Sequence, residues 1–141
     1  MNSMNTNEKG YTLIELLAVV VILGIISVIA VVGIGQLINQ SKERAFVSQA
    51  LHLKEAANLL ITSERVKNPD SIPSEVTYET LVQEGFLEKI KDPFTGSIIE
   101  PSAATKVSAQ NGRITEVCLH GEDYLLCEAP GNLKTENIKP K

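Results

Sequence analysis

An uninterrupted block of apolar residues close to the N-terminus dominates the pattern of the chain. No charged residue occurs from Leu16 to Ser41, and from Leu16 to Gly35 every residue except Ser27 is Ala, Val, Ile, Leu or Gly. As an α-helix, these 20 residues extend over about 30 Å, the thickness of the hydrocarbon core of a bilayer. The segment is apolar on every side, and a domain of this size cannot enclose such a helix. We therefore predict a membrane-spanning helix over residues 11–38.

Beyond the apolar block, the helical rhythm continues but becomes amphipathic. Apolar residues recur at helical spacing through residues 39–66, with charged residues between them, and Asn68-Pro69 is a typical helix end. We expect one continuous helix whose outer half packs against a small domain. A shorter helix should follow, with Thr77 as its N-cap and Gly85 as its C-terminal stop.

The C-terminal part of the chain has the pattern of an antiparallel sheet. Residues 106–110 and 113–119 flank Asn111-Gly112, a dipeptide typical of two-residue hairpin turns. A second turn around Glu122-Asp123 would bring residues 124–127 against the preceding strand. The predicted fold class is therefore α+β, a long N-terminal helix packed on a small antiparallel sheet.

These patterns predict one globular domain rather than two, and they divide the chain into four parts. We expect a polar leader at residues 1–10 and a transmembrane and assembly helix at residues 11–38. A globular head at residues 39–128 should include the outer half of the helix, and residues 129–141 should form a loose polar tail.

Two cysteines, Cys118 and Cys127, fall within the predicted sheet. In the expected register they lie directly opposite each other, with Cα atoms about 4.5–5.5 Å apart, a separation that a disulfide can bridge. The alternative is a pair of unrelated buried thiols. A disulfide here would contribute on the order of 2–3 kcal/mol to stability. It would also imply that the head faces an oxidising space outside the cytoplasm.

Composition offers little material for catalysis or for nucleic-acid binding. The chain has 13 Lys and Arg against 17 Asp and Glu, and no basic face suited to duplex DNA. His52 and His120 are the only histidines and lie near no recognisable nucleophile motif, so we expect no catalytic residue and no cofactor. His120 with two cysteines supplies too few ligands for zinc. The carboxylates of Glu122, Asp123 and Glu128 are expected to be solvated rather than to bind calcium, so no metal site is predicted.

Glu15 is a carboxylate inside the beginning of the apolar block and therefore requires an explanation. In the centre of a bilayer an ionised carboxylate costs roughly 2.5–3.5 kcal/mol on insertion scales. One interpretation is that Glu15 stays hydrated at the membrane interface. The other is that it awaits a positive charge, which cleavage after Gly10 would create as the α-amine of Tyr11, at i−4. In a filament, the amine of one subunit could meet Glu15 of a neighbour.

A secretory signal peptide cleaved after Ala30 is the competing explanation of the apolar block. Three features count against it. The apolar run continues beyond Ala30, Lys9 is the one basic residue of the leader, and Glu15 lies within the start of the run.

The string Lys-Gly-Tyr-Thr-Leu-Ile-Glu at residues 9–15, followed by the long apolar helix, resembles the class III signal of type IV pilins and the related pseudopilins. The resemblance implies that a membrane aspartyl prepilin peptidase cuts between Gly10 and Tyr11 and then methylates the new amine of Tyr11. It also implies that Glu15 is the assembly glutamate. The family usually has Phe at the position of Tyr11, so the aromatic ring is kept.

The resemblance further implies a protein that waits in the cytoplasmic membrane as a single-pass subunit, with its head outside the cytoplasm. It would then join an extracellular or cell-surface helical filament of identical subunits. The implied partners are the prepilin peptidase, an assembly platform with its ATPase, and minor pilins. DNA would be a partner only indirectly, in a competence pilus.

Three functions stay open at this point. The first is a structural subunit of a type IV pilus for adhesion, motility or DNA uptake, which the cysteine pair favours. The second is the major pseudopilin of a type II secretion system, which the chain resembles in size and in Asp-Pro-Phe-Thr-Gly at residues 92–96. The whole segment 85–96 resembles the connecting loop of Gram-positive major pilins as well as that of type II secretion pseudopilins. The third is a membrane-anchored binding domain that never polymerises.

Overall fold

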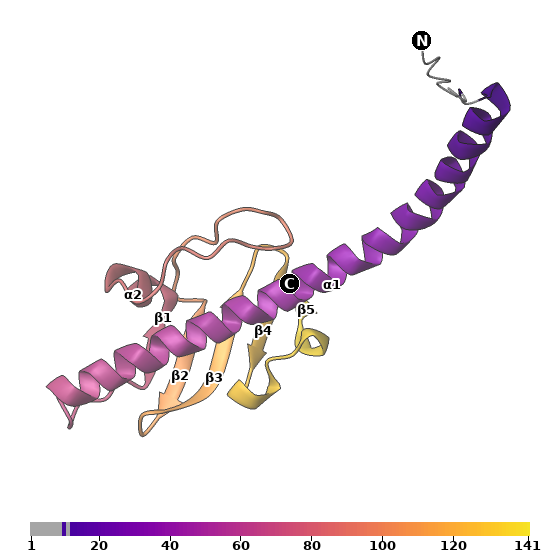
Figure 1. Ribbon diagram of the computed structural model, residues 1–141. Coiled ribbons are helices and arrows are strands. Elements are labelled where there is room, and N and C mark those ends of the chain that lie inside the picture. The colour runs from indigo at the N-terminus through magenta and orange to yellow at the C-terminus, as the bar shows by residue number, and fades with distance from the viewer. Residues whose placement is uncertain (1–9, 11) are drawn as a thin grey trace, which may run out of the picture. The chain divides into compact units, whose positions relative to one another are not determined.

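The computed structural model describes residues 10 and 12–141, so the expected leader at residues 1–9 and Tyr11 lie outside the described residues. The chain forms two compact units that divide between Ile38 and Asn39. Its longest element is helix α1, Leu13–Lys67 (Figure 1). The other elements, in chain order, are β1 (Glu75–Thr77), α2 (Tyr78–Gln83), β2 (Lys106–Gln110), β3 (Arg113–His120), β4 (Tyr124–Glu128), the 3-10 helices η1 (Pro130–Asn132) and η2 (Thr135–Asn137), and β5 (Lys139–Pro140).

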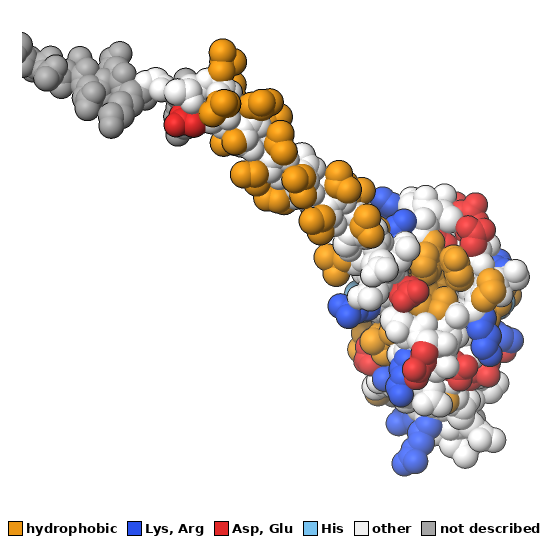
Figure 2. All heavy atoms as spheres, turned by 90° about the vertical axis from the view of Figure 1, so that its right-hand side faces the viewer, with side chains coloured by type: hydrophobic (Ala, Val, Ile, Leu, Met, Phe, Trp, Pro, Cys, Tyr) orange, Lys and Arg blue, Asp and Glu red, His pale blue; other side chains and the backbone are white. Residues whose placement is uncertain are grey.

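The N-terminal part of α1 is apolar and uncovered. Every residue from Thr12 to Ser41 is exposed, and hydrophobic side chains cover this part of the helix (Figure 2). Among the described residues, α1 is the one helix long and apolar enough to cross a membrane. Such a surface is unfavourable in water and favourable in lipid, so the structure fits a membrane-anchored, single-pass protein. The predicted continuous helix is also confirmed, and it ends just before Asn68-Pro69.

In the second unit, the outer half of α1 packs on a five-stranded antiparallel sheet. The strand order is β1-β2-β3-β4-β5, so each strand pairs with its neighbour in the sequence. Seven α1 residues are buried, and most recur every three or four positions: Phe46, Ala50, Leu53, Ala56, Ala57, Leu60 and Ile61. They share one core with the sheet residues Val107, Val117, Leu119 and Leu126. The predicted α+β class is confirmed.

The predicted turn chemistry is confirmed at the two ends of α2 and at the β2–β3 hairpin. The Thr77 side chain accepts a hydrogen bond from the backbone N–H of Thr80 and caps α2. Gly85, just beyond that helix, has a φ of +79°. Asn111 and Gly112 have φ values of 52° and 75°, and two consecutive positive values define the type I′ turn that matches strand twist in two-residue hairpins. These positions explain why the β2–β3 hairpin forms where the sequence predicts it.

The structure adds a strand that the sequence pattern did not predict. Residues Glu75, Val76 and Thr77 form β1 and pair with Ser108, Val107 and Lys106 of β2. A strand of three residues between Pro73 and α2 is too short for an alternation of apolar and polar residues to be recognised in the sequence. β1 is nevertheless well anchored, because Val76 is buried and the Lys106 Nζ lies 2.9 Å from a carboxylate oxygen of Glu75.

The expectation of a loose tail at residues 129–141 is wrong. The segment folds as η1, η2 and β5, and β5 pairs with Tyr124 and Leu125 of β4. Leu133 is buried in the core, and the backbone N–H of Lys141 donates to the carbonyl of Asp123 over 2.9 Å. Two apolar side chains, Leu133 and Ile138, and a few backbone hydrogen bonds hold this otherwise polar stretch, which is why its composition resembled that of a free end.

The connection between α2 and β2 contains a single isolated β-bridge, and a buried hydroxyl holds it in place. Tyr78 is fully buried, and its hydroxyl donates to the Ile99 carbonyl over 2.9 Å and accepts from the Ile90 N–H over 2.7 Å. Burial raises the pKa of this hydroxyl above its ordinary value, so it stays a neutral donor and acceptor.

Candidate functional site

Glu15 is hydrogen-bonded at the start of α1. The backbone N–H of Thr12 donates to the Glu15 Oε2 over 3.1 Å, and the backbone N–H of Glu15 lies 3.4 Å from the Thr12 Oγ1. This reciprocal arrangement is a capping box, in which a Thr and a Glu three residues later satisfy N–H groups left free at a helix N-terminus. This role of Thr12 was not predicted, although Thr-x-x-Glu before an apolar run is the sequence signal of a capping box.

The capping box changes the physical description of Glu15. Inside one chain, the carboxylate accepts from a backbone N–H and lies at the positive end of the helix macrodipole, which lowers the cost of its position beside the bilayer. The backbone N–H is neutral, so this bond does not balance the charge. A full positive charge from outside the capping box could therefore still bind Glu15 strongly.

The predicted cleavage site lies at the edge of the described residues. Gly10 is exposed, two residues before the cap residue Thr12. Tyr11, whose amine is the expected site of methylation and the expected partner of Glu15, lies outside the described residues. Cleavage between Gly10 and Tyr11 and the pairing of that amine with Glu15 therefore stay predictions.

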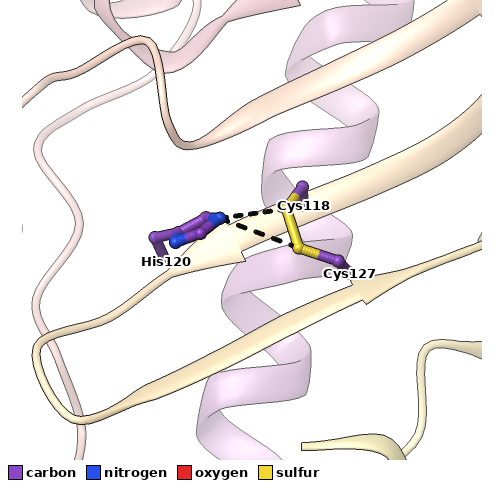
Figure 3. A group of neighbouring side chains, drawn as sticks. All are labelled: Cys118, His120 and Cys127. Carbon is purple, nitrogen blue, oxygen red and sulfur yellow. Dashed lines mark hydrogen bonds between the residues drawn. A yellow bond between two sulfur atoms is a disulfide. The ribbon is translucent and has the colours of Figure 1, made fainter. Parts of the chain in front are cut away.

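Cys118 on β3 and Cys127 on β4 are directly opposite each other in the sheet register, as predicted, with a Cα–Cα distance of 3.9 Å. Their sulfur atoms are joined as a disulfide (Figure 3). Because Val117 and Leu119 on either side of Cys118 belong to the core, the alternation of a strand places the disulfide on the opposite face of the sheet from α1.

His120 stands beside the disulfide, on the same face of β3 as Cys118 (Figure 3). Its Nε2 lies 3.2 Å from the Cys118 Sγ and 3.8 Å from the Cys127 Sγ. Partial burial, and then the positive charge of Lys141, lower the pKa of His120 below its ordinary value. The imidazole is therefore neutral at neutral pH. The sequence did not predict this proximity, because it depends on the register of the β3–β4 pair.

The acidic residues near the β3–β4 turn do not gather into a ligand set. Glu122 and Asp123 are exposed and Glu128 is partly exposed, and within residues 10 and 12–141 the only group of three potential ligands is Cys118, His120 and Cys127. Asp92 has a different role. It is 1% exposed, and its two carboxylate oxygens accept from the backbone N–H groups of Phe94 and Glu122, each over 2.8 Å.

Removal of the disulfide is expected to destabilise the head without changing its fold. The double variant Cys118→Ser, Cys127→Ser should lose about 2–3 kcal/mol of unfolding free energy, because the unfolded chain regains the entropy of a nine-residue separation. Urea denaturation of the detergent-solubilised full chain measures this. The wild-type chain under a reducing agent is the matched control and should show a similar loss. An unchanged midpoint in both samples would contradict the expectation.

Comparison with known families supports the interpretation of the N-terminal segment. The family model of the prokaryotic N-terminal methylation motif matches residues 5–31. The chain thus carries the class III prepilin signal of type IV pilins and pseudopilins, which form structural rather than enzymatic families. No curated protein and no solved structure is similar to the chain at a significant level.

Proposed function

Because the chain carries a prepilin signal ahead of a membrane-spanning helix, we propose that it is a structural subunit of a type IV pilus, cleaved after Gly10 and polymerised through α1. The observation that carries the proposal is the position of the signal. A cut ahead of the apolar helix leaves the anchor on the mature chain, whereas a secretory cut would remove it. The subunit would therefore wait in the membrane before assembly.

The energetics of polymerisation favour a role for Glu15. Transfer of α1 from lipid into a bundle of identical helices exchanges one apolar environment for another, with little net hydrophobic driving force. Specific polar contacts must then select the register between subunits. We propose that the carboxylate of Glu15 receives the α-amine of Tyr11 from a neighbouring subunit, a charge-assisted bond in a low-dielectric environment.

The disulfide near the C-terminus supports a surface pilus over the alternative, a major pseudopilin of a type II secretion system. A bond between β3 and β4 covalently secures the strands nearest the C-terminal segment, which suits a fibre exposed to shear and proteases outside the cell. The turn at residues 92–96 is the feature that favours the pseudopilin alternative. A non-polymerising membrane-anchored binding domain is the third possibility, but this function would not explain why the chain carries a prepilin signal.

Substitution of Gly10 is expected to block processing. The peptidase must accommodate the residue before the cut bond, and Gly10→Val adds bulk and restricts the backbone at that position. The variant chain should retain its leader, stay in the membrane fraction and yield no sheared fibres. Intact-mass spectrometry and immunoblots of membrane and sheared fractions measure this. Mutation of the exposed Gly131, far along the chain, to Val is the matched control; normal cleavage of the Gly10 variant would contradict the proposal.

Electron microscopy of cells that express the native operon separates the three functions. Long surface fibres that bind antibodies against the head support a pilus. Short fibres confined to the cell envelope would support a secretion pseudopilin, and the absence of fibres with processed protein in the membrane would support a solitary binding domain. Neighbouring genes give an independent check, because a retraction ATPase accompanies pili more often than secretion systems.

A further inference from the structure

The side chains of Cys118, His120 and Cys127 form a cluster of potential metal ligands, a feature that the disulfide alone does not explain. Its Sγ, Nε2 and Sγ atoms all lie within 4.8 Å of one another, on two adjacent strands of one rigid sheet. Cys118 is 7% exposed, and the other two side chains are partly exposed, so the cluster is shielded but accessible. Two thiolates and an imidazole are the donor atoms that thiophilic cations such as zinc prefer.

The observed distances are close to those of a tetrahedral ligand set. Zn–S bonds of about 2.3 Å and Zn–N bonds of about 2.0 Å at tetrahedral angles place S and N about 3.5 Å apart and two sulfurs about 3.8 Å apart. The Nε2 of His120 already lies 3.2 Å and 3.8 Å from the two sulfurs. Only the sulfur–sulfur separation must grow once the covalent bond is absent, which rotation of the two cysteine side chains can supply.

We propose that the dithiol form of this protein binds one zinc ion through Cys118, Cys127 and His120, with water as the fourth ligand. From the sequence we expected too few ligands for such a site. The fold brings three together, and three protein ligands with a water constitute an established zinc coordination type. The zinc ion and the disulfide are mutually exclusive, and each would link β3 to β4 through Cys118 and Cys127.

Zinc binding and disulfide formation change the two thiols in different ways. Zinc binding to the dithiol releases two thiol protons and leaves both sulfurs as thiolates, with no change in oxidation state. Disulfide formation instead removes two protons and two electrons from the thiols and delivers them to an oxidant, for example the disulfide of a thiol oxidoreductase, which becomes a dithiol. A bound zinc ion occupies the sulfur electron pairs that such a reaction needs, so it should slow the oxidation of the two thiols.

The surroundings of His120 suit a metal ligand. Its ring lies on the same face of β3 as Cys118, with the Nε2 directed at both sulfur atoms over 3.2 Å and 3.8 Å. The backbone of His120 is fixed by Thr105, whose Oγ1 accepts from the His120 N–H over 3.0 Å. This support on β3 restricts the position of the ring before any metal arrives.

The proposal is tested with the full-length chain in detergent, reduced by a phosphine. The phosphine takes one oxygen from water to become its oxide, while the disulfide becomes two thiols. After transfer to metal-free buffer, Co²⁺ is added as a spectroscopic substitute for zinc. We expect thiolate-to-cobalt charge-transfer bands and tetrahedral d–d bands that saturate at one metal per chain and vanish when Zn²⁺ is added. The oxidised chain should show neither.

Two histidine variants make the test specific. His120→Ala should weaken Co²⁺ and Zn²⁺ binding by more than about tenfold, because a direct ligand is lost. His52→Ala, which removes the exposed histidine of α1, should bind as the wild type does. Circular dichroism and the ability of His120→Ala to re-form its disulfide establish that this variant is folded.

The oxidation rate gives a second readout that does not depend on metal spectra. Zinc should slow reoxidation of the wild-type dithiol several-fold and should leave His120→Ala much less protected. Equal metal binding by the two histidine variants, binding of one metal by two chains, or no binding by the reduced wild type would each overturn the proposal.

Discussion

Replacement of Glu15 by Val is expected to abolish filament assembly while membrane insertion and leader removal continue. Val makes the start of α1 more apolar, so insertion is not impaired. Assembly fails because no carboxylate remains to receive the Tyr11 amine of a neighbouring subunit, and apolar contacts alone do not select a register. Immunoblots of sheared and membrane fractions, with intact-mass spectrometry of the membrane-bound chain, measure both effects.

The capping box supplies two further variants that separate charge from helix capping. Glu15→Gln keeps a side-chain oxygen that can accept from the Thr12 N–H, but it has no charge for the amine. Thr12→Ala keeps the charge of Glu15 and loses the hydroxyl near the Glu15 N–H, at a cost of about 0.5–2 kcal/mol to the helix end.

If the charge is what assembly requires, Glu15→Gln should give no filaments and Thr12→Ala should still give them. The reverse result, filaments from Glu15→Gln and none from Thr12→Ala, would show that Glu15 acts through its cap. It would contradict the role assigned to the ion pair.

Replacement of Asp92 by Ala is expected to be the most destabilising single change in the head among those considered. Its carboxylate is 1% exposed and accepts from two backbone N–H groups, one in its own turn and one on Glu122 beside β4. Without the carboxylate, both donors lose a charged partner in a shielded site. Hydrogen bonds to charged groups contribute about 1.5–3 kcal/mol each, so the loss of two is expected to cost roughly 3–6 kcal/mol.

Urea denaturation and hydrogen–deuterium exchange of the full chain in detergent measure this effect, and exchange should rise in both the residue 92–96 turn and the β3–β4 turn. Asp92→Asn keeps one accepting oxygen and should lose about half as much stability. Asp123→Ala, an exposed acid in the same β3–β4 turn, is the matched control and should change stability by less than about 0.5 kcal/mol. Equal effects of Asp92→Ala and Asp123→Ala would contradict the assigned role.

The sequence predicts those parts of the fold whose signals are local. The apolar block and its amphipathic continuation predict α1, because helical periodicity extends over many turns. Asn111-Gly112 predicts the β2–β3 hairpin, because few residues other than Asn and Gly adopt two consecutive positive φ values. The cysteine register follows from that hairpin and the next turn, so Cys118 opposite Cys127 could be predicted without a structure.

The parts that could not be predicted depend on contacts between distant segments. Asp92 and Glu122 are 30 residues apart, and no local pattern links a turn carboxylate to that backbone N–H. β1 and the ordered C-terminal segment are short stretches whose stability comes from the edges of a sheet already formed. The capping box is a different case. Its signal, Thr12 followed three residues later by Glu15 ahead of an apolar run, is local, so the sequence alone is sufficient to predict it.

Mass spectrometry of the mature chain from its native host tests the central claim most directly. The account predicts a chain that begins at Tyr11, with one methyl group on its α-amine and α1 retained. A mature chain that begins at Met1, or downstream of Ala30, would contradict it, because neither chain offers an amine to Glu15 at the head of the membrane helix.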